Sequence, residues 1–538
     1  MAAGGPVSEW WRGAVIYQVY PRSFADSNGD GIGDLAGLVT HLDYIAALGV
    51  DAVWVSPFYT SPMLDFGYDV ADFCDVDPMF GTLEGFDAVV ARAHALGLKV
   101  VIDQVYSHSS DQHPWFTDSR SARDSKRADW YVWADAKPDG SPPNNWQSLF
   151  VGSAWTWDAT RGQYYMHNFL REQPDLNLLN PAVQDALLEV ARFWLDRGVD
   201  GFRIDAVSHF THDAQLRDNP PRIGGERSRP VDFQQLLYNA DRIETLTFLE
   251  RLRATIDRYP DRLALGEIGG PCSAQRSLSP YLAPHRLHTA YSFRFLLADA
   301  PTPEFVRTAV GEWERAHAGG WPTWVFSNHD APRALSRWGG EAAPPPYAIV
   351  LNALLLTLRG SVCLYQGEEL GLPQAHVPFE RLRDPEAIAN WPRTLGRDGA
   401  RTPMPWIAKG RHGGFSRAEP WLPMEPRHLP LAVDMQAGVA NSVLESTRRL
   451  LALRRRHPAL VDGAQRFIDG SESVLGFERS AGADRVLCLF NLGATPVKTL
   501  PIVGRWRSVA GSVAAGNEIV GSIALPAYGF VLAVPSGS

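Results

Sequence analysis

The 538-residue sequence is poor in several features that would mark a specialised class of protein. It has only four cysteines (Cys74, Cys272, Cys363 and Cys488), with no CxxC pair and no histidine at metal-ligand spacing. We therefore expect free thiols in a reducing compartment. Its 51 Lys and Arg residues are outnumbered by 60 Asp and Glu, which gives a net charge of −9. Because nucleic-acid binding needs clustered positive charge, this balance argues against such a partner.

Long apolar segments are also missing. No stretch approaches the ~18 consecutive apolar residues of a membrane span. The N-terminus, MAAGGPVSEWWRG, lacks the basic region and apolar run of a secretory leader. These absences favour a cytoplasmic protein that has no membrane partner.

What the sequence does contain is an alternation of buried-strand and amphipathic-helix patterns. The run AVIYQVY (14–20) is rich in β-branched and aromatic residues, and residues 35–48 then carry leucines at helical spacing before Gly49. Repetition of this pair predicts a parallel sheet. Eight strand candidates, the number that a closed (β/α)8 TIM barrel needs, lie at 14–20, 50–57, 98–105, 199–205, 263–267, 290–293, 324–330 and 361–369.

Two regions depart from this alternation and suggest further domains. Residues 105–175 are rich in Trp, Ser, Asp, Asn and Pro without helical periodicity, which predicts a small domain inserted after the third strand. From about residue 463 the strand patterns are short and consecutive, which predicts a C-terminal antiparallel β-sandwich. The expected division is 1–104 (barrel), 105–175 (inserted domain), 176–462 (barrel, with long connections at 206–262 and 371–434) and 463–538 (sandwich).

Polar residues gather at the C-terminal ends of the predicted strands, where parallel barrels carry their active sites. Asp205, Glu267 and Asp330 end the fourth, fifth and seventh strands, so three carboxylates should converge at the barrel mouth. Each alone could cap a helix or pair with an arginine, but with Arg203 and His329 beside them they favour catalysis. Glycoside cleavage needs an ionised nucleophile and a protonated general acid. We expect Asp205 to be the nucleophile, with a pKa lowered by Arg203, and Glu267 to be the acid.

The motifs around these residues resemble those of the α-amylase superfamily, glycoside hydrolase family 13, and its oligo-1,6-glucosidase-like α-glucosidases. VIDQVYSHSS, GFRIDAV, GEIGG and FSNHD resemble the four catalytic-strand motifs in the right order, and QPDLN (173–177) resembles a fifth. The resemblance covers essentially the whole chain. It implies a retaining, exo-acting α-glucosidase in which Asp205 is the nucleophile, Glu267 the acid/base and Asp330 the transition-state stabiliser.

The same resemblance implies a set of residues that hold the cleaved glucose: Asp65, Tyr68, His108, Arg203, His329 and either Arg397 or Arg401. Tyr68 would stack against the sugar ring. Asp65 and an arginine from GRDGARTPMPW would grip the far hydroxyls and close the pocket, which makes the enzyme exo-acting. We favour Arg397 for this role, although the sequence leaves Arg401 open.

Linkage and acceptor are less closely determined. The residue after the nucleophile is Ala206, where α-1,6 enzymes of the family tend to carry Val. We therefore expect α-1,4-linked substrates such as maltose, cleaved through a covalent β-glucosyl–Asp205 intermediate. Water, a sugar or an alcohol could attack that intermediate, so a transglucosylase and an oligo-1,6-glucosidase remain alternatives. Non-enzymatic transporter subunits of the family lack the carboxylates and carry a membrane anchor, unlike this chain.

The expected partners are a small-molecule sugar substrate and a small acceptor. We expect the connection 206–262 to wall off the acceptor side and so to favour disaccharide donors. The sequence does not determine whether the protein forms a homodimer.

The segment DSNGDGIGD (26–34) has the alternating oxygen donors of a calcium loop. Five residues would supply oxygens to a hard cation: Asp26, Asn28, Asp30, Ile32 (through its carbonyl) and Asp34. The twelfth-position Glu of a helix–loop–helix calcium sensor is replaced by Gly37. The family resemblance implies a structural Ca²⁺ (or Mg²⁺) here and no organic cofactor. A Gly-rich turn without an ion is the alternative.

Overall fold

The computed structural model describes residues 9–224, 228–269, 278–316, 320–394, 396–468, 472–499 and 502–537. Eight parallel strands form a closed barrel in the order β1-β2-β5-β9-β10-β11-β12-β13, and β13 pairs back onto β1. They are β1 (Val15–Val19), β2 (Ala52–Val55), β5 (Lys99–Gln104), β9 (Gly201–Ile204), β10 (Leu263–Ile268), β11 (Thr289–Ser292), β12 (Trp321–Val325) and β13 (Ser361–Tyr365). This confirms the predicted TIM barrel.

One strand differs in extent from its prediction. β12 begins three residues before the expected segment and ends at Val325, so His329 and Asp330 lie in the loop that follows it rather than on the strand. Trp321 and Pro322 instead pair with β11. The sequence pattern predicted that a strand is present here but placed both of its ends too late in the chain.

Helices surround the barrel, and several begin and end where the sequence predicts. Asp34 caps the first one by accepting a hydrogen bond from the Gly37 N–H, and Gly49 ends it with φ 93°. Asn180 caps the fourth, with Pro181 in its first turn. The helices are α1 (Leu35–Leu48), α2 (Leu83–Ala95), α3 (Pro114–Ser121), α4 (Pro181–Asp196), α5 (Thr245–Ile256), α6 (Pro303–Ala316), α7 (Ala334–Gly339), α8 (Pro345–Thr357), α9 (Pro385–Asn390), α10 (Val433–Gln436), α11 (Val443–Arg456) and α12 (Pro458–Val461).

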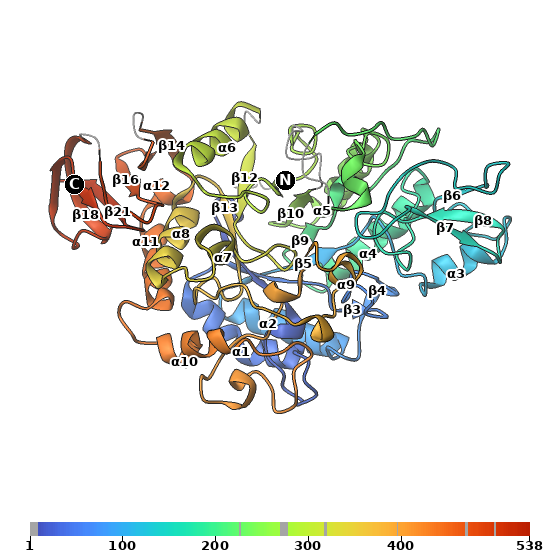
Figure 1. The fold of residues 1–538 in the computed structure, drawn as a ribbon, viewed down its shortest axis with the longest axis horizontal. Helices are drawn as coiled ribbons and strands as arrows, with labels where there is room; N and C mark the ends of the chain where they lie inside the picture. Colours follow the sequence, from blue (N-terminus) through green and yellow to red (C-terminus); the bar gives the residue numbers. More distant parts are fainter. Residues whose placement is uncertain are drawn as a thin grey trace, which may run out of the picture.

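The region after β5 forms a separate small sheet, in the order β6-β8-β7, at the right of Figure 1. Its strands, and those of the hairpin that follows β2, are β6 (Trp133–Ala134), β7 (Trp155–Asp158), β8 (Gln163–Met166), β3 (Tyr59–Thr60) and β4 (Asp72–Val76). The connection 206–262 packs on this region: the Trp146 indole donates to the Arg217 carbonyl (2.9 Å) and the Asn239 amide to the Asn168 side chain (3.1 Å). The domain boundaries themselves remain predictions.

The C-terminal region is an antiparallel six-stranded sheet, in the order β14-β15-β16-β21-β18-β19, at the left of Figure 1. A smaller β17-β20 pair contributes Val497 and Leu525 to the apolar cluster on one face of the sheet. The other face packs on the barrel helices through Phe477 and Phe490. The strands are β14 (Ala464–Phe467), β15 (Leu475–Ala481), β16 (Asp484–Phe490), β17 (Val497–Lys498), β18 (Ile502–Gly511), β19 (Glu518–Gly521), β20 (Ala524–Leu525) and β21 (Phe530–Pro535).

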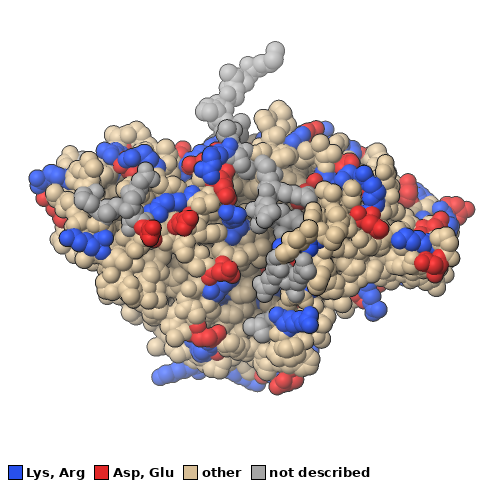
Figure 2. Space-filling model, turned by 45° about the horizontal axis from the view of Figure 1, so that its top comes forward, with Lys and Arg blue, Asp and Glu red and all other residues tan. Residues whose placement is uncertain are grey.

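Three further sequence expectations concern thiols, membranes and charge. Cys74, Cys363 and Cys488 are free thiols, and Cys272 lies outside the described residues. Among the helices of the described ranges, none combines the length and the apolar character that crossing a bilayer requires. On the face shown in Figure 2, positive and negative side chains are interspersed without a broad area of one sign.

Candidate active site

One arginine at the centre of the barrel holds three carboxylates. Arg203, on β9, donates from Nη1 to Asp103 Oδ1 and Asp205 Oδ1, each at 2.5 Å, and its Nη2 lies 2.6 Å from Glu267 Oε1. Its side chain is fully buried, and it also contacts the Tyr291 hydroxyl through Nε (3.2 Å) and Nη2 (2.9 Å). The two carboxylates that we expected to do the chemistry therefore share one guanidinium, a fixed planar fork of donors.

This crowding corrects our expectation for Asp205. Burial raises its pKa well above the usual range, as do the neighbouring Glu267 and Asp103, and the charge of Arg203 only partly opposes this. Burial likewise raises the pKa of Asp103 to about 6. Arg203 does lower the pKa of Asp205, but one cation cannot offset burial and two carboxylate neighbours. The cluster therefore retains a proton that an isolated Arg–Asp pair would release.

Glu267 is positioned by its neighbours across the sheet. The Tyr291 hydroxyl donates to Glu267 Oε1 (3.1 Å), and the Ala206 N–H donates to Oε2 (3.1 Å). Tyr291 is the direct register partner of Glu267 between β10 and β11. Ala206 has φ 44°, in the left-handed region that non-glycine residues rarely adopt, and such strain is concentrated at functional sites. It lets the backbone after Asp205 turn toward Glu267.

Asp330 and His329 form the third side of the cluster. Arg401 Nη2 lies 2.7 Å from Asp330 Oδ1, and Arg401 Nε donates to the His329 carbonyl (2.7 Å). Burial opposes ionisation of Asp330, but His329, Arg401 and Arg397 hold its pKa below the usual range. The Asp330 side chain is 26% exposed, more than those of Asp205 and Glu267. Asp330 is therefore an ionised carboxylate that faces the open side of the site.

The histidines of the site are neutral. Burial lowers the pKa of both His108 and His329 to about 3. The Gln18 amide donates to His329 Nδ1 (2.7 Å), which leaves the proton on Nε2, 2.6 Å from the Tyr68 hydroxyl. The Tyr68 and His329 rings stack with centroids 5.4 Å apart. Tyr68 therefore presents a firmly held aromatic ring beside Asp330.

A second arginine cluster lies at the rim. Arg397 Nη2 contacts Asp65 Oδ1 (2.7 Å) and Asp384 Oδ1 (2.8 Å), and its Nη1 lies 3.5 Å from Asp330 Oδ1. The Gln173 amide donates to Asp65 Oδ2 (3.0 Å). Of the two arginines left open by the sequence, the one that pairs with Asp65 is thus Arg397, whereas Arg401 is bound to Asp330.

Aromatic side chains from the inserted region line the same side. Phe150 lies under the Arg397 guanidinium, 4.8 Å from its Cζ. Phe169 contacts Phe150 (centroids 5.6 Å apart), His108 (5.1 Å) and His209 (5.9 Å). This wall connects the inserted sheet region to the rim cluster, so both contribute to one site.

The Trp54 indole donates to Asp103 Oδ2 (2.8 Å) and so also belongs to the site. Several residues of the site were not selected from the sequence: Trp54, Tyr291, Gln173, Asp384, Phe150 and Phe169. Two of them had a usable signal. Tyr291 is a polar residue on a predicted barrel strand next to that of Glu267, and Gln173 opens the QPDLN motif. Asp384 lies in the connection 371–434, where no sequence pattern distinguishes it from its polar neighbours.

The loop 26–34 lies between β1 and α1, and its carboxylates accept hydrogen bonds mostly from within the loop; Asp26 Oδ2 also accepts one from the Ser416 hydroxyl (2.5 Å). Asp26 accepts from the N–H groups of Gly29 (2.6 Å) and Gly31 (2.8 Å), and Asp30 accepts from that of Ile32 (2.8 Å). Asp34 caps α1. In the part of the chain that the structure describes, no group of three or more His, Cys, Asp or Glu side chains is arranged to hold a metal ion. The oxygen chemistry suits a hard cation, but the metal site remains a prediction.

Comparisons with known proteins are consistent with this geometry. Residues 18–463 match the family model "Alpha amylase, catalytic domain". The chain is 51% identical over 534 residues to a probable alpha-glucosidase of Rhizobium meliloti (strain 1021), and the match covers 97% of each protein. It is 35% identical over 525 residues to an oligo-1,6-glucosidase of Parageobacillus thermoglucosidasius, and this match covers 91% of this chain and 92% of the relative.

A solved structure, that of the alpha-glucosyl transfer enzyme XgtA, superposes with a TM-score of 0.94 at 50% identity, covering 98% of this chain and 99% of the other. Both the sequence and the fold thus match over nearly their full length. The chain therefore belongs to the α-amylase family and is a homologue of its α-glucosidases.

Proposed function

We propose that the protein is a retaining, exo-acting α-glucosidase that also transfers glucosyl groups to small acceptors. The observation that carries this proposal is the single guanidinium of Arg203 in contact with both Asp205 and Glu267. Retaining glycosidases keep their two carboxyl groups about 5–5.5 Å apart, and inverting enzymes about 6.5–9.5 Å. Two carboxylates bound to one guanidinium are compatible with the shorter separation.

The roles follow from the surroundings of each group. Asp205 attacks the anomeric carbon to form a β-glucosyl ester, while Glu267, as the general acid, donates a proton to the departing oxygen. Glu267 then takes a proton from the water or alcohol that cleaves the ester. Asp330, ionised by its arginine partners, stabilises the positive charge that develops on the sugar ring.

The rim cluster accounts for exo action in this proposal. Asp65 and Arg397 form an ion pair at one side of the catalytic carboxylates, and Asp384 and Phe150 hold Arg397 in place. A terminal glucose has free hydroxyls to offer such a pair, whereas an internal residue would continue into it. The Tyr68 ring would support the face of that glucose.

Linkage and acceptor choice are the finer part of the proposal. Ala206 leaves more room than Val beside the nucleophile and supports α-1,4 substrates such as maltose. The 51% identity to a probable alpha-glucosidase supports hydrolysis, whereas the 50% identity to an alpha-glucosyl transfer enzyme favours a predominantly transferring enzyme as the second candidate. An oligo-1,6-glucosidase, as in the relatives near 35% identity, is the third.

The contact between the connection 206–262 and the inserted region supports a restricted acceptor side. If that restriction holds, maltose should be a better substrate than maltotetraose. Equal kcat/KM values for the two sugars would contradict it.

A product analysis separates these candidates. Purified enzyme is supplied with maltose or isomaltose, with and without a small alcohol, and free glucose is scored against alkyl glucoside. We expect maltose to give the higher kcat/KM, an α-glucoside to appear with the alcohol, and Asp205→Asn to remove both products. A β-configured product would contradict retention, and preference for isomaltose would favour the 1,6-glucosidase.

A further inference from the structure

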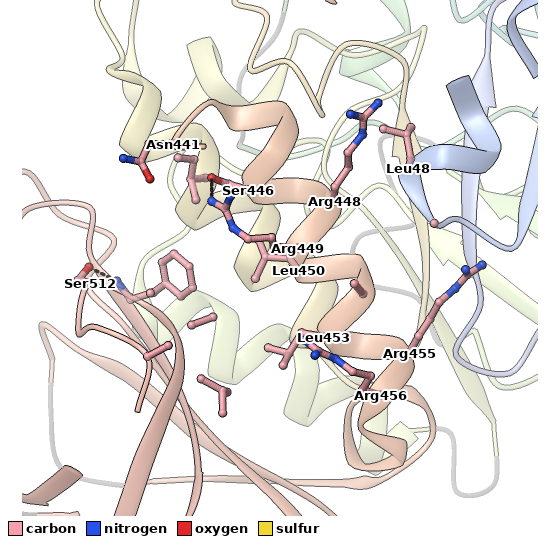
Figure 3. A pocket seen from close by; sticks show the side chains of 18 of the residues that line it. Leu48, Asn441, Ser446, Arg448, Arg449, Leu450, Leu453, Arg455, Arg456 and Ser512 are labelled. Carbon is pink, nitrogen blue, oxygen red and sulfur yellow. Dashed lines mark hydrogen bonds between the residues drawn. The ribbon is translucent and has the colours of Figure 1, made fainter. Parts of the chain in front are cut away.

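A groove of about 1060 Å³ lies away from the catalytic cluster, between α11, α8, the end of α1 and the β18 strand with the turn after it (Figure 3). Arg454 of α11 is buried beneath it and donates to the carbonyls of Gly13 and Gly360, which precede β1 and β13. The groove is therefore near the N-terminal ends of the barrel strands, whereas Asp205 and Glu267 are at the C-terminal ends. Its volume is at the upper end of the range for small-molecule sites.

The charge of this groove has one sign. Arg448, Arg449, Arg455 and Arg456 line it, and no Asp or Glu is among the lining residues. Two of these arginines have carboxylate partners nearby: Arg448 pairs with Glu445 (2.7 Å) and Arg455 lies 3.4 Å from Asp51. Within the described residues the other two, Arg449 and Arg456, form no ion pair. Arg449 still feels the charge of Glu445, whose pKa it helps to lower, but neither arginine has a carboxylate within ion-pair distance in the described residues.

The two arginines without an ion pair lie on the same helix. They are seven residues apart on α11, which is about two helical turns, or roughly 10 Å along the axis. In Figure 3 the Arg449 guanidinium lies beside Ser446 and Asn441 and that of Arg456 beside Leu453, while Arg448 and Arg455 point toward the α1 side. Arg449 Nη2 donates to the Ser446 hydroxyl (3.0 Å), which steadies its position. The pair therefore forms two cationic points on one wall.

The surface between these points is apolar, with a few hydroxyls. Leu450 and Leu453 of α11 are buried and form the floor, and Phe530 lines the opposite wall. The Ser512 hydroxyl accepts a hydrogen bond from the Phe530 N–H (3.2 Å), so its own proton remains free to donate to a ligand. An apolar floor between two guanidiniums suits a molecule with an apolar body and an anionic group at each end.

We propose that this groove binds a small organic dianion whose two carboxylate or phosphate groups lie about 10 Å apart, one on Arg449 and the other on Arg456. Guanidinium groups bind both anions through paired hydrogen bonds. Because the ligand would contact α11 and the β18 strand together, it would also hold the C-terminal sheet against the barrel. The proposal is independent of the catalytic assignment, since the groove contains none of the catalytic carboxylates.

Calorimetric titration at low ionic strength tests this with decanedioate, whose ends can span the two arginines, and butanedioate, which is too short. Fructose 1,6-bisphosphate, with phosphates on a polar body, distinguishes the preferred head group. We expect decanedioate or the bisphosphate to bind at least about tenfold more tightly than butanedioate, because only they reach both guanidiniums. Binding should raise the Tm while kcat/KM for maltose stays unchanged.

Matched variants locate the site. Arg449→Ala and Arg456→Ala should each weaken binding about tenfold, and Arg456→Lys less, because it keeps the charge but loses the planar fork. Arg258→Ala, which removes an exposed guanidinium elsewhere, should bind as the wild type does. Equal binding by all variants, equal affinity for short and long dianions, or no heat with any probe would overturn the proposal. If a variant fails to fold, the comparison of long and short dianions on the wild-type protein still tests the proposal.

Discussion

The molecule contains two clusters in which one arginine faces three carboxylates, and they behave differently. Arg203 at the barrel centre contacts Asp103, Asp205 and Glu267, and the pKa values of both aspartates there are raised, mainly by burial. At the rim, Arg397 likewise contacts Asp65, Asp384 and Asp330. A similar count of charges thus leaves two carboxyl pKa values raised at the barrel centre and lowers two of the three at the rim.

The difference comes from a second cation. Arg401 contacts Asp330 and also helps to lower the pKa of Asp384, against the effect of burial. Of the three carboxylates on Arg397, Asp65 has a raised pKa, through burial, with Arg397 and Arg401 opposing it. Among the described residues, no second arginine pairs with the carboxylates of the barrel cluster. The two aspartate carboxyl groups at the barrel centre therefore hold their protons more tightly than isolated carboxyls, whereas fixed negative charge is available at the rim, where sugar hydroxyls must be held.

The largest expected effect is at the barrel cluster. Asp205→Ala should lower kcat for an aryl α-glucoside by about 10⁴-fold or more, because it removes the group that forms the covalent intermediate. Added azide should restore part of the turnover and give a β-glucosyl azide by direct attack, which product NMR would identify. The rim variant Asp384→Asn is the matched control and should not respond to azide. Retention of more than a tenth of the wild-type kcat by Asp205→Ala would contradict the nucleophile assignment.

The next effect should separate the two rim arginines. Arg397→Lys keeps the charge but cannot contact Asp65 and Asp384 together, so KM for maltose should rise about 10- to 100-fold. Arg401→Lys disturbs Asp330 and should lower kcat more than it raises KM. Steady-state kinetics with maltose measure both, and circular dichroism checks folding. If the two variants showed the same division between kcat and KM, the distinct roles of Arg397 and Arg401 would be wrong.

The contrast between the clusters also shows where sequence reasoning succeeded. The eight strands could be predicted because buried parallel strands leave continuous β-branched runs, and Asp205 and Glu267 could be placed because parallel strands bring their C-terminal ends to one rim. The choice between Arg397 and Arg401 could not be made, since they are four residues apart and only the path of the connection 371–434 decides which one meets Asp65.

The prediction that the pKa of Asp205 is lowered was wrong for a related reason. The sequence showed that Arg203 is two residues from Asp205. It did not show that the fold brings two further carboxylates close to Asp205: those of Asp103 and Glu267, which are 102 and 62 residues away in the chain. Nor did it show that Asp205 is buried. Local spacing predicts a pair, whereas an electrostatic environment is the sum over everything that the fold brings near.

The pH dependence of kcat/KM tests this electrostatic environment of Asp205. The acid limb of kcat/KM should lie above the ordinary carboxyl pKa of about 3.9, because the nucleophile must lose a proton that the barrel cluster holds. Asp103→Asn removes a negative neighbour that raises the pKa of Asp205, so the acid limb should move to lower pH, by about half a unit to one unit. Asp384→Asn should leave its position unchanged. If the acid limb moved to higher pH in Asp103→Asn, the inference that the charge of Asp103 raises the pKa of Asp205 would be wrong.

The smallest effect concerns carboxylates that have no arginine at all. Asp26, Asp30 and Asp34 form no ion pair within the described residues, so an external cation would have to supply the charge that Arg203 and Arg397 provide elsewhere. If the loop binds Ca²⁺ or Mg²⁺ as predicted, saturating metal should raise the Tm by about 2–5 °C relative to protein treated with a chelator.

Differential scanning calorimetry with and without CaCl₂ or MgCl₂ measures this shift. Asp30→Ala should abolish it with little change in kcat/KM, because the loop lies between β1 and α1 and Asp30 contacts none of the catalytic side chains. Asp75→Ala, an exposed aspartate outside the loop, is the matched control and should keep the full response. An equal metal response in both variants would place the ion elsewhere, and no response in the wild type would mean that the protein's own hydrogen-bond donors satisfy these carboxylates.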